Sequence, residues 1–322
     1  AVHILEELSA ETDSLAHEVG RPLSLVAESD MNDPRLITPR DQGGLGMTAQ
    51  WDDDIHHAIH SAVSGERQGY YGDFGTLATL AETLRHGYFH AGTYSSFRGR
   101  RHGRPLDTAT IPATRLLAYT LTHDQVGNRA IGDRPSQNLT VGQQAIKAAL
   151  ALGSPYTAML FMGEEWASSS PFQFFSSHPE PELARATAEG RKKEFADHGW
   201  DADEIPDPQD PETFTRSKLK WDETADGEHA QLLEFYRALI ALRRNEPDMA
   251  DPWLDNLGVD YDEEQRWFVM RRGALAIACN LGTQAADVPV TGEVVLAWGE
   301  PAAGKQATRI DGHSVAVLRG VN

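Results

Sequence analysis

The chain has 322 residues, with 29 Lys and Arg against 48 Asp and Glu, and therefore a formal net charge of −19 at pH 7. This acidity argues against a nucleic-acid-binding protein, which needs basic groups to neutralise phosphates, and against docking on an anionic membrane. The single cysteine, Cys279, excludes a disulfide framework and a metal site built from several thiolates, and it fits a reducing compartment. No apolar run reaches the ~20 residues needed to cross a membrane. We therefore expect a cytoplasmic globular protein of two domains, or one large one, without nucleic-acid or membrane partners.

The N-terminal residues predict one helix and then one strand. Leucines at positions 5, 8 and 15, set among polar residues, indicate an amphipathic helix over residues 4–19. The tripeptide Gly-Arg-Pro at positions 20–22 ends that helix. Residues 23–27 (LSLVA) are mostly apolar and lead directly into Glu28. This pattern is typical of a buried parallel strand with functional residues at its carboxyl end.

The same pattern recurs at two later places. Residues 115–122 form an apolar segment that runs into His123 and Asp124, and residues 157–162 form another that runs into the sequence GEEW. Between them, residues 141–152 (VGQQAIKAALAL) predict a helix. Strands alternating with helices indicate βαβ units and a parallel sheet. In barrels and in open sheets of this kind, the carboxyl edge of the strands carries the active site.

Beyond residue 166 the pattern changes twice. Residues 167–225 are rich in Pro, Asp and Ser and predict a long irregular insertion, which a helix over residues 228–244 follows. From about residue 252, short apolar segments alternate with turn residues and predict a small antiparallel β domain. We expect the strands of this domain at residues 267–270, 275–279, 294–298 and 314–318.

Glu28 and Asp124 are the candidate catalytic carboxylates. A single Glu after a strand is more often a structural ion-pair partner, and an Asp in a turn is often a helix cap. Asp124, however, stands in the sequence HDQVGNR (123–129), which brings a carboxylate, an imidazole, two amides and a cation to one strand end. Such a cluster suits recognition of a polyhydroxylated ligand. Two carboxylates that converge from different strands on one bond provide the arrangement that glycoside hydrolysis uses.

The segment AQWDDDIHHAIH (49–60) allows more than one interpretation. His56, His57 and His60 have the helical spacing of metal ligands, so a zinc site is one alternative, although no cysteine lies nearby. Trp51 suits core packing, with a stacking platform for a sugar ring as the alternative.

Four motifs carry a resemblance to known proteins: LVAESD (25–30), AQWDDDIHHAIH (49–60), THDQVGNRA (122–130) and MLFMGEEW (159–166). Together they resemble the α-amylase superfamily of glycoside hydrolases. The resemblance implies an α/β fold, the second half of a (β/α)8 TIM barrel followed by a small antiparallel β-sandwich domain. The barrel part is expected over residues 1–250, with the insertion 167–225, and the β domain over residues 251–322.

Further segments narrow the resemblance to one family in the superfamily. SSFRGRRHG (95–103), a stretch over residues 169–195 and PDPQDPETF (206–214) are similar to the malto-oligosyltrehalose trehalohydrolase family. The likeness covers most of the chain to about residue 222. It implies hydrolysis of the α-1,4-glucosidic bond next to the trehalose end of maltooligosyl trehalose. Branching or debranching of α-glucans, and glucan binding without catalysis, are the alternatives.

The resemblance also assigns roles to residues of this chain. Glu28 matches the general acid/base at the end of the fifth barrel strand, and Asp124 matches the carboxylate that stabilises the transition state at the end of the seventh. No metal and no cofactor are implied. The residues expected to bind the maltooligosaccharide-type substrate are Val2, His3, Trp51, Asp53, Asp54, His56, His57, His123, Gln125, Val126, Gly127 and Asn128.

The third catalytic group of the superfamily is an aspartate in a motif that runs Asp-Ala-Val-His. This chain opens with Ala1-Val2-His3, so we expect the nucleophile immediately upstream of Ala1. Four strand–helix units cannot close a barrel, and they leave two unpaired edges. We therefore expect an N-terminal half of the barrel as a partner, in a longer polypeptide or as a separate fragment.

Overall fold

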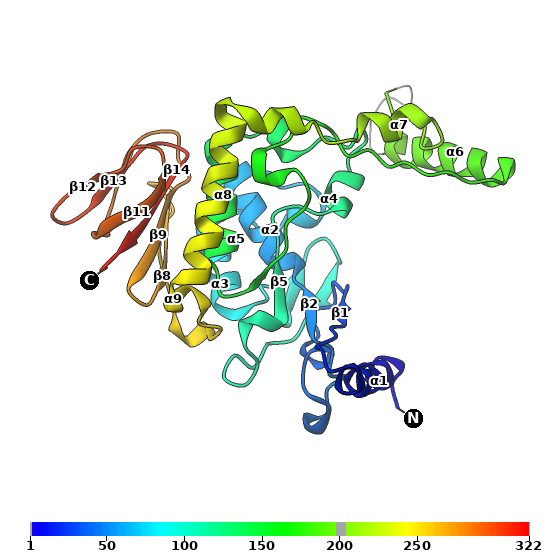
Figure 1. The fold of residues 1–322 in the computed structure, drawn as a ribbon, viewed down its shortest axis with the longest axis horizontal. Coiled ribbons are helices and arrows are strands. Elements are labelled where there is room, and N and C mark those ends of the chain that lie inside the picture. The colour runs from blue at the N-terminus through cyan, green and yellow to red at the C-terminus, as the bar shows by residue number, and fades with distance from the viewer. Residues whose placement is uncertain (1, 198–203, 322) are drawn as a thin grey trace. The chain divides into compact units, whose positions relative to one another are not determined.

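The computed structural model describes residues 2–197 and 204–321 (Figure 1). Ala1, next to which the nucleophile was expected, lies outside the described residues. The chain divides into two compact units, which we describe separately. The first contains Ala1–Thr120, Ala145–Met159 and Phe235–Asn322, and the second contains Leu121–Gln144 and Leu160–Glu234. No helix in the described part of the chain combines the length and apolar character required to cross a bilayer.

A four-stranded parallel sheet positions the candidate site in the first unit. Its strands are β1 (Val26–Ala27), β2 (Ala49–Trp51), β5 (Leu116–Ala118) and β6 (Thr157–Ala158), and they lie in that order. All three neighbouring pairs are parallel. The predicted parallel sheet is therefore confirmed.

The strands are shorter than the sequence predicts, and β1 is less buried. Ladder pairing begins only at Val26 and ends at Ala27, although residues 23–27 are apolar enough for a longer strand. Val26 is 43% exposed, so the prediction of a buried strand is wrong at this position. The reason is that β1 lies at the edge of the described sheet, where it pairs with β2 alone. At the other edge, β6 ends at Ala158, before the predicted residue 162.

Helix boundaries follow local sequence signals. Helix α1 (Ile4–Val19) has the predicted bounds, because His3 Nδ1 accepts a hydrogen bond from the Leu5 amide at 3.2 Å and Gly20 adopts a left-handed conformation at φ 66°. Its exposed apolar side chains include Ile4, Leu8, Leu15 and Val19. The predicted helices at 141–152 and 228–244 are confirmed as α5 (Val141–Gly153) and α8 (Gly227–Asn245).

Two further helices and a hairpin belong to the first unit. The N-cap of helix α2 (Asp53–Ser64) is Asp52, whose Oδ1 accepts a hydrogen bond from the Ile55 amide at 3.2 Å. Helix α3 (Leu77–His86) follows. The antiparallel hairpin of β3 (Thr93–Ser95) and β4 (Arg100–His102) was not predicted.

The second unit contains the insertion, which is less irregular than the sequence suggests. Two helices form there, α6 (Pro181–Asp197) and α7 (Pro211–Arg216), so the prediction of an irregular segment is wrong over these ranges. Helix α7 has a proline at its first position and an N-cap, Asp210, that accepts from the Glu212 amide. Residues 198–203 of the predicted insertion lie outside the described residues. The unit also contains α4 (His123–Gly127).

The C-terminal residues form the predicted antiparallel β domain after a short helix α9 (Pro247–Ala250). One sheet has the order β11-β14-β9-β8-β7, with strands Glu293–Trp298, Ser314–Arg319, Leu275–Asn280, Trp267–Arg272 and Leu257–Asp262. The other has the order β10-β13-β12, with strands Ala286–Val288, Thr308–Ile310 and Ala302–Ala303. Both sheets contribute to one buried core. The larger sheet provides Val269 and Leu318, and the smaller sheet provides Val288 and Ile310.

Candidate active site

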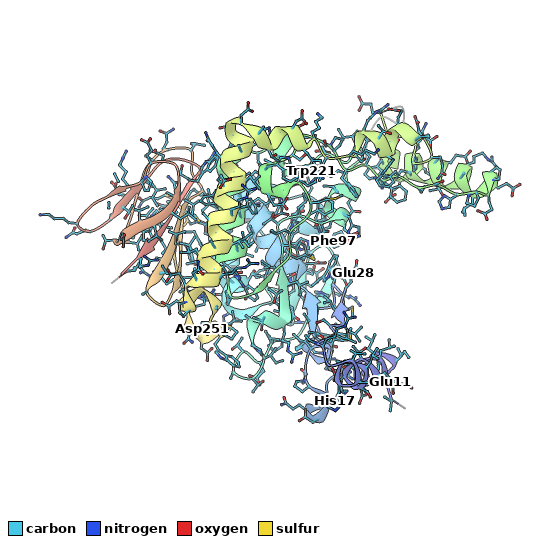
Figure 2. The ribbon with its side chains drawn as sticks, in the orientation of Figure 1. Glu11, His17, Glu28, Phe97, Trp221 and Asp251 are labelled. Atoms are coloured by element: carbon cyan, nitrogen blue, oxygen red, sulfur yellow. The ribbon has the colours of Figure 1, made fainter. Side chains whose placement is uncertain are left out.

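Glu28 stands at the carboxyl end of β1, as the sequence predicts, and its side chain is exposed (Figure 2). The backbone that follows it is held by side chains from three other segments. Gln50 Nε2 donates to the Ser29 carbonyl at 3.2 Å, and His102 Nε2 donates to the Asp30 carbonyl at 2.8 Å. The Asp30 carboxylate pairs with Arg98 at 2.6 Å. These bonds fix the backbone of the loop after Glu28, whereas the side chain of Glu28 itself is exposed to solvent.

Three consecutive aspartates follow β2 and have different environments. Asp52 caps α2 and is almost fully buried, and its Oδ2 has no hydrogen-bond partner. Burial, with a further effect from the charge of Asp54, raises the pKa of Asp52 well above its usual range. Asp54 is also buried, and its Oδ2 accepts hydrogen bonds from Asn32 Nδ2 at 2.9 Å and from the His90 amide at 2.8 Å. Burial raises the pKa of Asp54, and the bonds from His90 and Asn32 oppose that rise.

Asp53, which stands between Asp52 and Asp54 in the sequence, is half-buried and forms a hydrogen bond with the residue that follows β5. The phenolic hydroxyl of Tyr119, the residue directly after β5, donates a hydrogen bond to Asp53 Oδ1. The Tyr119 ring contacts Trp51 edge-on at 5.8 Å between ring centroids. Trp51 is half-buried, so part of its surface remains open to a ligand. Asp53 and Trp51 thus lie together at the carboxyl edge of the sheet.

Two of the three histidines of α2, His56 and His60, stack on each other inside the first unit. The His56 ring lies parallel to the rings of Tyr119 and His60, with centroid distances of 5.4 and 5.6 Å. His56 Nε2 lies 2.9 Å from the Tyr71 hydroxyl. Burial, followed by the charge of His60, lowers the pKa of His56 well below its usual range. His56 is therefore a buried neutral imidazole at pH 7.

The third histidine of α2, His57, is half-buried. Its ring stacks on Tyr70 at 4.8 Å, and burial lowers its pKa to about 3. No group of three His, Cys, Asp or Glu residues among those described has an arrangement that could hold a metal ion. The zinc alternative for these histidines therefore has no geometric support in the described chain.

The second unit contains the predicted cluster at residues 123–128. Thr122 caps α4 by accepting from the Asp124 amide at 3.1 Å, and it donates to Gln125 Oε1 at 2.7 Å. His123 Nε2 lies 3.5 Å from Asp124 Oδ1, and both side chains are about half exposed. An exposed carboxylate next to an imidazole can bind sugar hydroxyls. In the same cluster, the Val126 side chain is buried.

Helix α6 stabilises this cluster from within the same unit. Arg191 Nη2 donates to the Gly127 carbonyl at 2.6 Å and to the Arg129 carbonyl at 3.3 Å. The Arg191 guanidinium also lies over the rings of Phe174 and Phe195, at 5.0 and 4.4 Å. Arg191 was not among the predicted residues, because nothing in its local sequence indicates a contact with residues more than 60 positions earlier.

Two further predicted residues, Val2 and His3, belong to the first unit. Val2 and His3 are exposed at the start of α1, where His3 serves as the cap described above. Glu28 belongs to the first unit and Asp124 to the second, so each carboxylate is described within its own unit. The convergence of the two remains a prediction.

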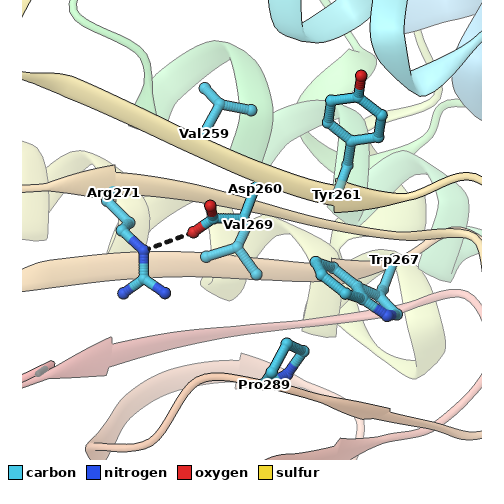
Figure 3. A pocket seen from close by; sticks show the side chains of 7 residues that line it. All are labelled: Val259, Asp260, Tyr261, Trp267, Val269, Arg271 and Pro289. Carbon is cyan, nitrogen blue, oxygen red and sulfur yellow. Dashed lines mark hydrogen bonds and ion pairs between the residues drawn. The ribbon is translucent and has the colours of Figure 1, made fainter.

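Two surface hollows of the first unit are lined by other residues. One of about 520 Å³ in the C-terminal β domain has Trp267 and Val269 on one side and Pro289 on the other, with the Asp260–Arg271 ion pair at 2.8 Å beside it (Figure 3). Another of about 540 Å³ has Arg40 and Arg115 among its lining residues. Neither contains Glu28 or a residue of the 123–128 cluster.

Comparison with known proteins gives a consistent result. This chain is 72% identical to the malto-oligosyltrehalose trehalohydrolase of Mycobacterium tuberculosis over 319 residues. The match covers 99% of this chain and 55% of the Mycobacterium tuberculosis protein. The predicted resemblance is confirmed. A Rhizobium sp. protein of the same name is 51% identical over 98% of this chain and 52% of its own length. The chain thus spans about half the length of the curated malto-oligosyltrehalose trehalohydrolases it matches.

Structural and domain comparisons agree with this likeness. A crystal structure of an α-amylase candidate from Salmonella typhimurium superposes with a TM-score of 0.83 at 34% identity, over 99% of this chain and 55% of the other. Residues 252–317 match a family model described as a domain of unknown function (DUF3459). The α/β arrangement with a β-rich C-terminal domain is therefore shared with an α-amylase-like protein.

Proposed function

We propose that this chain is the C-terminal part of a retaining glycoside hydrolase that releases trehalose from maltooligosyl trehalose. The observation that carries the proposal is the 72% identity to a malto-oligosyltrehalose trehalohydrolase across 99% of the chain. In this proposal residues 1–250, with the insertion 167–225, form the second half of a (β/α)8 barrel, and residues 251–322 form a β-sandwich domain. The four parallel strands in chain order support the half-barrel.

In the proposed reaction, Glu28 acts as the general acid and base. Its carboxylic acid protonates the oxygen that links the sugar chain to trehalose, and that bond breaks as an aspartate outside these 322 residues attacks the anomeric carbon. The deprotonated Glu28 then takes a proton from water. The resulting hydroxide equivalent displaces the aspartate and frees the sugar chain with retained configuration. The exposed position of Glu28 at a strand end supports this assignment.

Asp124 is proposed to stabilise the transition state from the second unit. Its carboxylate would accept hydrogen bonds from ring hydroxyls that become more acidic as the sugar gains oxocarbenium character, so the interaction strengthens in the transition state. We propose that His123, whose Nε2 lies 3.5 Å from Asp124 Oδ1, binds the same sugar. Trp51 and Asp53 are proposed to bind sugar at the edge of the sheet, and the other substrate-binding residues expected from the sequence stay predictions.

Incubation with maltooligosyl trehalose and analysis of the products test the function. The protein is assayed as the cell makes it. Its intact mass is measured first, because the chain covers only about half the length of its relatives. We expect free trehalose and a maltooligosaccharide shortened from its trehalose end. Branched products from amylose, or no trehalose, would contradict the proposal.

Replacement of Glu28 by Gln tests the assigned acid. We expect Glu28→Gln to reduce trehalose release by about 100-fold or more, because general acid catalysis contributes at least that factor, while substrate still binds. Glu11→Gln is the matched control, since Glu11 is an exposed carboxylate in α1 of the same unit (Figure 2). Turnover in Glu28→Gln close to that of the control would show that another group provides the proton.

A further inference from the structure

The loop after Glu28 is anchored at one point by two residues buried in the first unit. Asn32 is 1% exposed and adopts φ 48°, a left-handed conformation that Asn tolerates better than most residues. Its Nδ2 donates to Asp54 Oδ2 at 2.9 Å and to the His90 carbonyl at 3.2 Å. Its own carbonyl accepts from the Arg104 amide at 3.0 Å. Asn32 therefore connects the loop to α2 and to both sides of the β3–β4 hairpin.

Asp54 completes this anchor. The same oxygen that accepts from Asn32 also accepts from the His90 amide at 2.8 Å, so one carboxylate oxygen joins the loop to the segment before the hairpin. Asp54 is 5% exposed. A ligand in solution therefore has little access to its carboxylate. A side chain of this kind is better suited to holding backbone than to binding a sugar.

Glu28 depends on this anchor because its own side chain is exposed. Only three residues separate Glu28 from Asn32, and the backbone between them is fixed at Ser29 by Gln50 and at Asp30 by His102. A change at Asn32 or Asp54 would release the far end of this short loop. A displacement of about 1 Å in a reacting group is enough to reduce a rate by about 100-fold.

We propose that Asp54 is a positioning residue, which holds the loop through Asn32 and so places the Glu28 carboxyl group for proton transfer, and that it does not bind the sugar directly. This inference rests on the proposed function, in which Glu28 is the general acid. It separates Asp54 from its neighbour Asp53, which is more accessible and stays a candidate sugar ligand.

Three variants in the protein as the cell makes it test the inference. Asp54→Leu removes the acceptor, and Asp54→Asn keeps an oxygen that can accept both hydrogen bonds. Asn32→Gly removes the partner side chain but allows the same positive φ. Each is assayed by kcat/KM on two substrates. Maltooligosyl trehalose needs a proton on its leaving oxygen, whereas α-maltotriosyl fluoride releases fluoride without one. For both substrates, kcat/KM covers binding and the first bond cleavage but not the later hydrolysis of the glycosyl-enzyme.

We expect Asp54→Leu and Asn32→Gly to lower kcat/KM on maltooligosyl trehalose about 10- to 100-fold, and on the fluoride less than about threefold. Asp54→Asn should stay within about threefold of wild type on both substrates. Equal losses on the two substrates would overturn the inference, because they would indicate general disruption or lost sugar binding. So would a large loss in Asp54→Asn. If Asp54→Leu fails to fold, Asn32→Gly alone decides. If the wild-type protein releases no trehalose, the proposed function fails instead.

Discussion

The ammonium group of Lys147 in α5 lies 3.3 Å from Nδ1 of His60 in α2, and both side chains are buried. Because an ammonium group can only donate, His60 Nδ1 must accept, and its Nε2 then carries the proton. The protonated Nε2 donates a hydrogen bond to Glu66 Oε2 at 2.8 Å. Lys147, His60 and Glu66 thus form a polar chain that sets the tautomer of His60, on which the His56 ring stacks.

The first prediction concerns the stability that this chain provides. His60→Leu should lower the free energy of unfolding by about 2–3 kcal/mol, because it removes an acceptor of a buried ammonium group and a donor to a carboxylate. His86→Leu is the matched control, since His86 is exposed and lies 3.5 Å from Glu82 on α3. The control should cost about 0.5 kcal/mol or less. Urea unfolding of both variants measures the difference, and equal values would refute a stabilising role for His60.

The second prediction concerns the pH dependence of stability. Burial lowers the pKa of His57 to about 3, whereas an unfolded chain has the ordinary value of about 6.5. As the pH falls below about 6.5, the unfolded state therefore binds a proton that the folded state does not, and stability is lost until the pH reaches the folded value. Between pH 7 and pH 5 this one residue should account for about 2 kcal/mol of the loss.

His57→Gln tests this effect because glutamine does not titrate. Urea unfolding at pH 7 and pH 5 should show a smaller loss of stability in the variant than in the wild type, by that same amount. The comparison uses the change with pH, so any constant effect of the substitution on packing cancels. Parallel pH profiles for the two proteins would contradict the assigned shift.

The third prediction concerns the contact of Arg191 with the 123–128 cluster. Arg191→Met should remove the donor to the Gly127 and Arg129 carbonyls and the cation that covers Phe195. A loss of about 1–2 kcal/mol of local stability corresponds to roughly tenfold faster amide hydrogen exchange across α4. Arg185→Met in the same helix is the control, because Arg185 is 71% exposed and pairs with Glu189 at 3.7 Å. Unchanged exchange in Arg191→Met would show that α4 holds its structure without this contact.

The fourth prediction compares two adjacent arginines of β8. Arg272 is buried, and it donates to the carbonyls of Gly153 at 2.9 Å, Met249 at 3.2 Å and Asp251 at 2.6 Å. Burial lowers its pKa to about 10. Arg272→Met should therefore lower the free energy of unfolding by about 3 kcal/mol, since three buried carbonyls lose a charged donor.

Arg271 provides the control for this comparison. It pairs at the surface with Asp260 at 2.8 Å (Figure 3). Arg271→Met should cost less than about 1 kcal/mol, because exposed ion pairs contribute little. Thermal unfolding of the two variants checks the order, and an equal or reversed order would be inconsistent with Arg272 anchoring the β domain to the end of α5.

Local patterns were sufficient for the elements whose signals lie within a few residues. The start and end of α1 follow from His3 and Gly20, and the strands β9 and β14 follow from short apolar segments bounded by turns. The sequence also singles out Glu28 and Asp124 as candidate catalytic residues, because each follows an apolar segment that the resemblance assigns to a barrel strand. Their catalytic roles stay predictions.

Local patterns were insufficient for segments whose structure depends on distant partners. The insertion reads as irregular from its composition, and yet its helix α6 packs Arg191 against residues more than 60 positions earlier. The extent of β1 is likewise set by its pairing with β2, and its own apolar residues extend further than that pairing.

The three aspartates after β2 separate the two contributions most clearly. The sequence by itself determined that a cluster of acids begins α2 at the edge of the sheet. The cap that Asp52 provides is also local, because it accepts from the Ile55 amide only three residues later. Only the tertiary structure decided that Asp53 receives the hydroxyl of Tyr119 and that Asp54 receives Asn32 and the His90 amide. The partners of Asp54 and Asp53 lie 22, 36 and 66 residues away in the chain. Identical side chains in a row acquire different roles because successive helical residues point about 100° apart, each toward a different part of the fold.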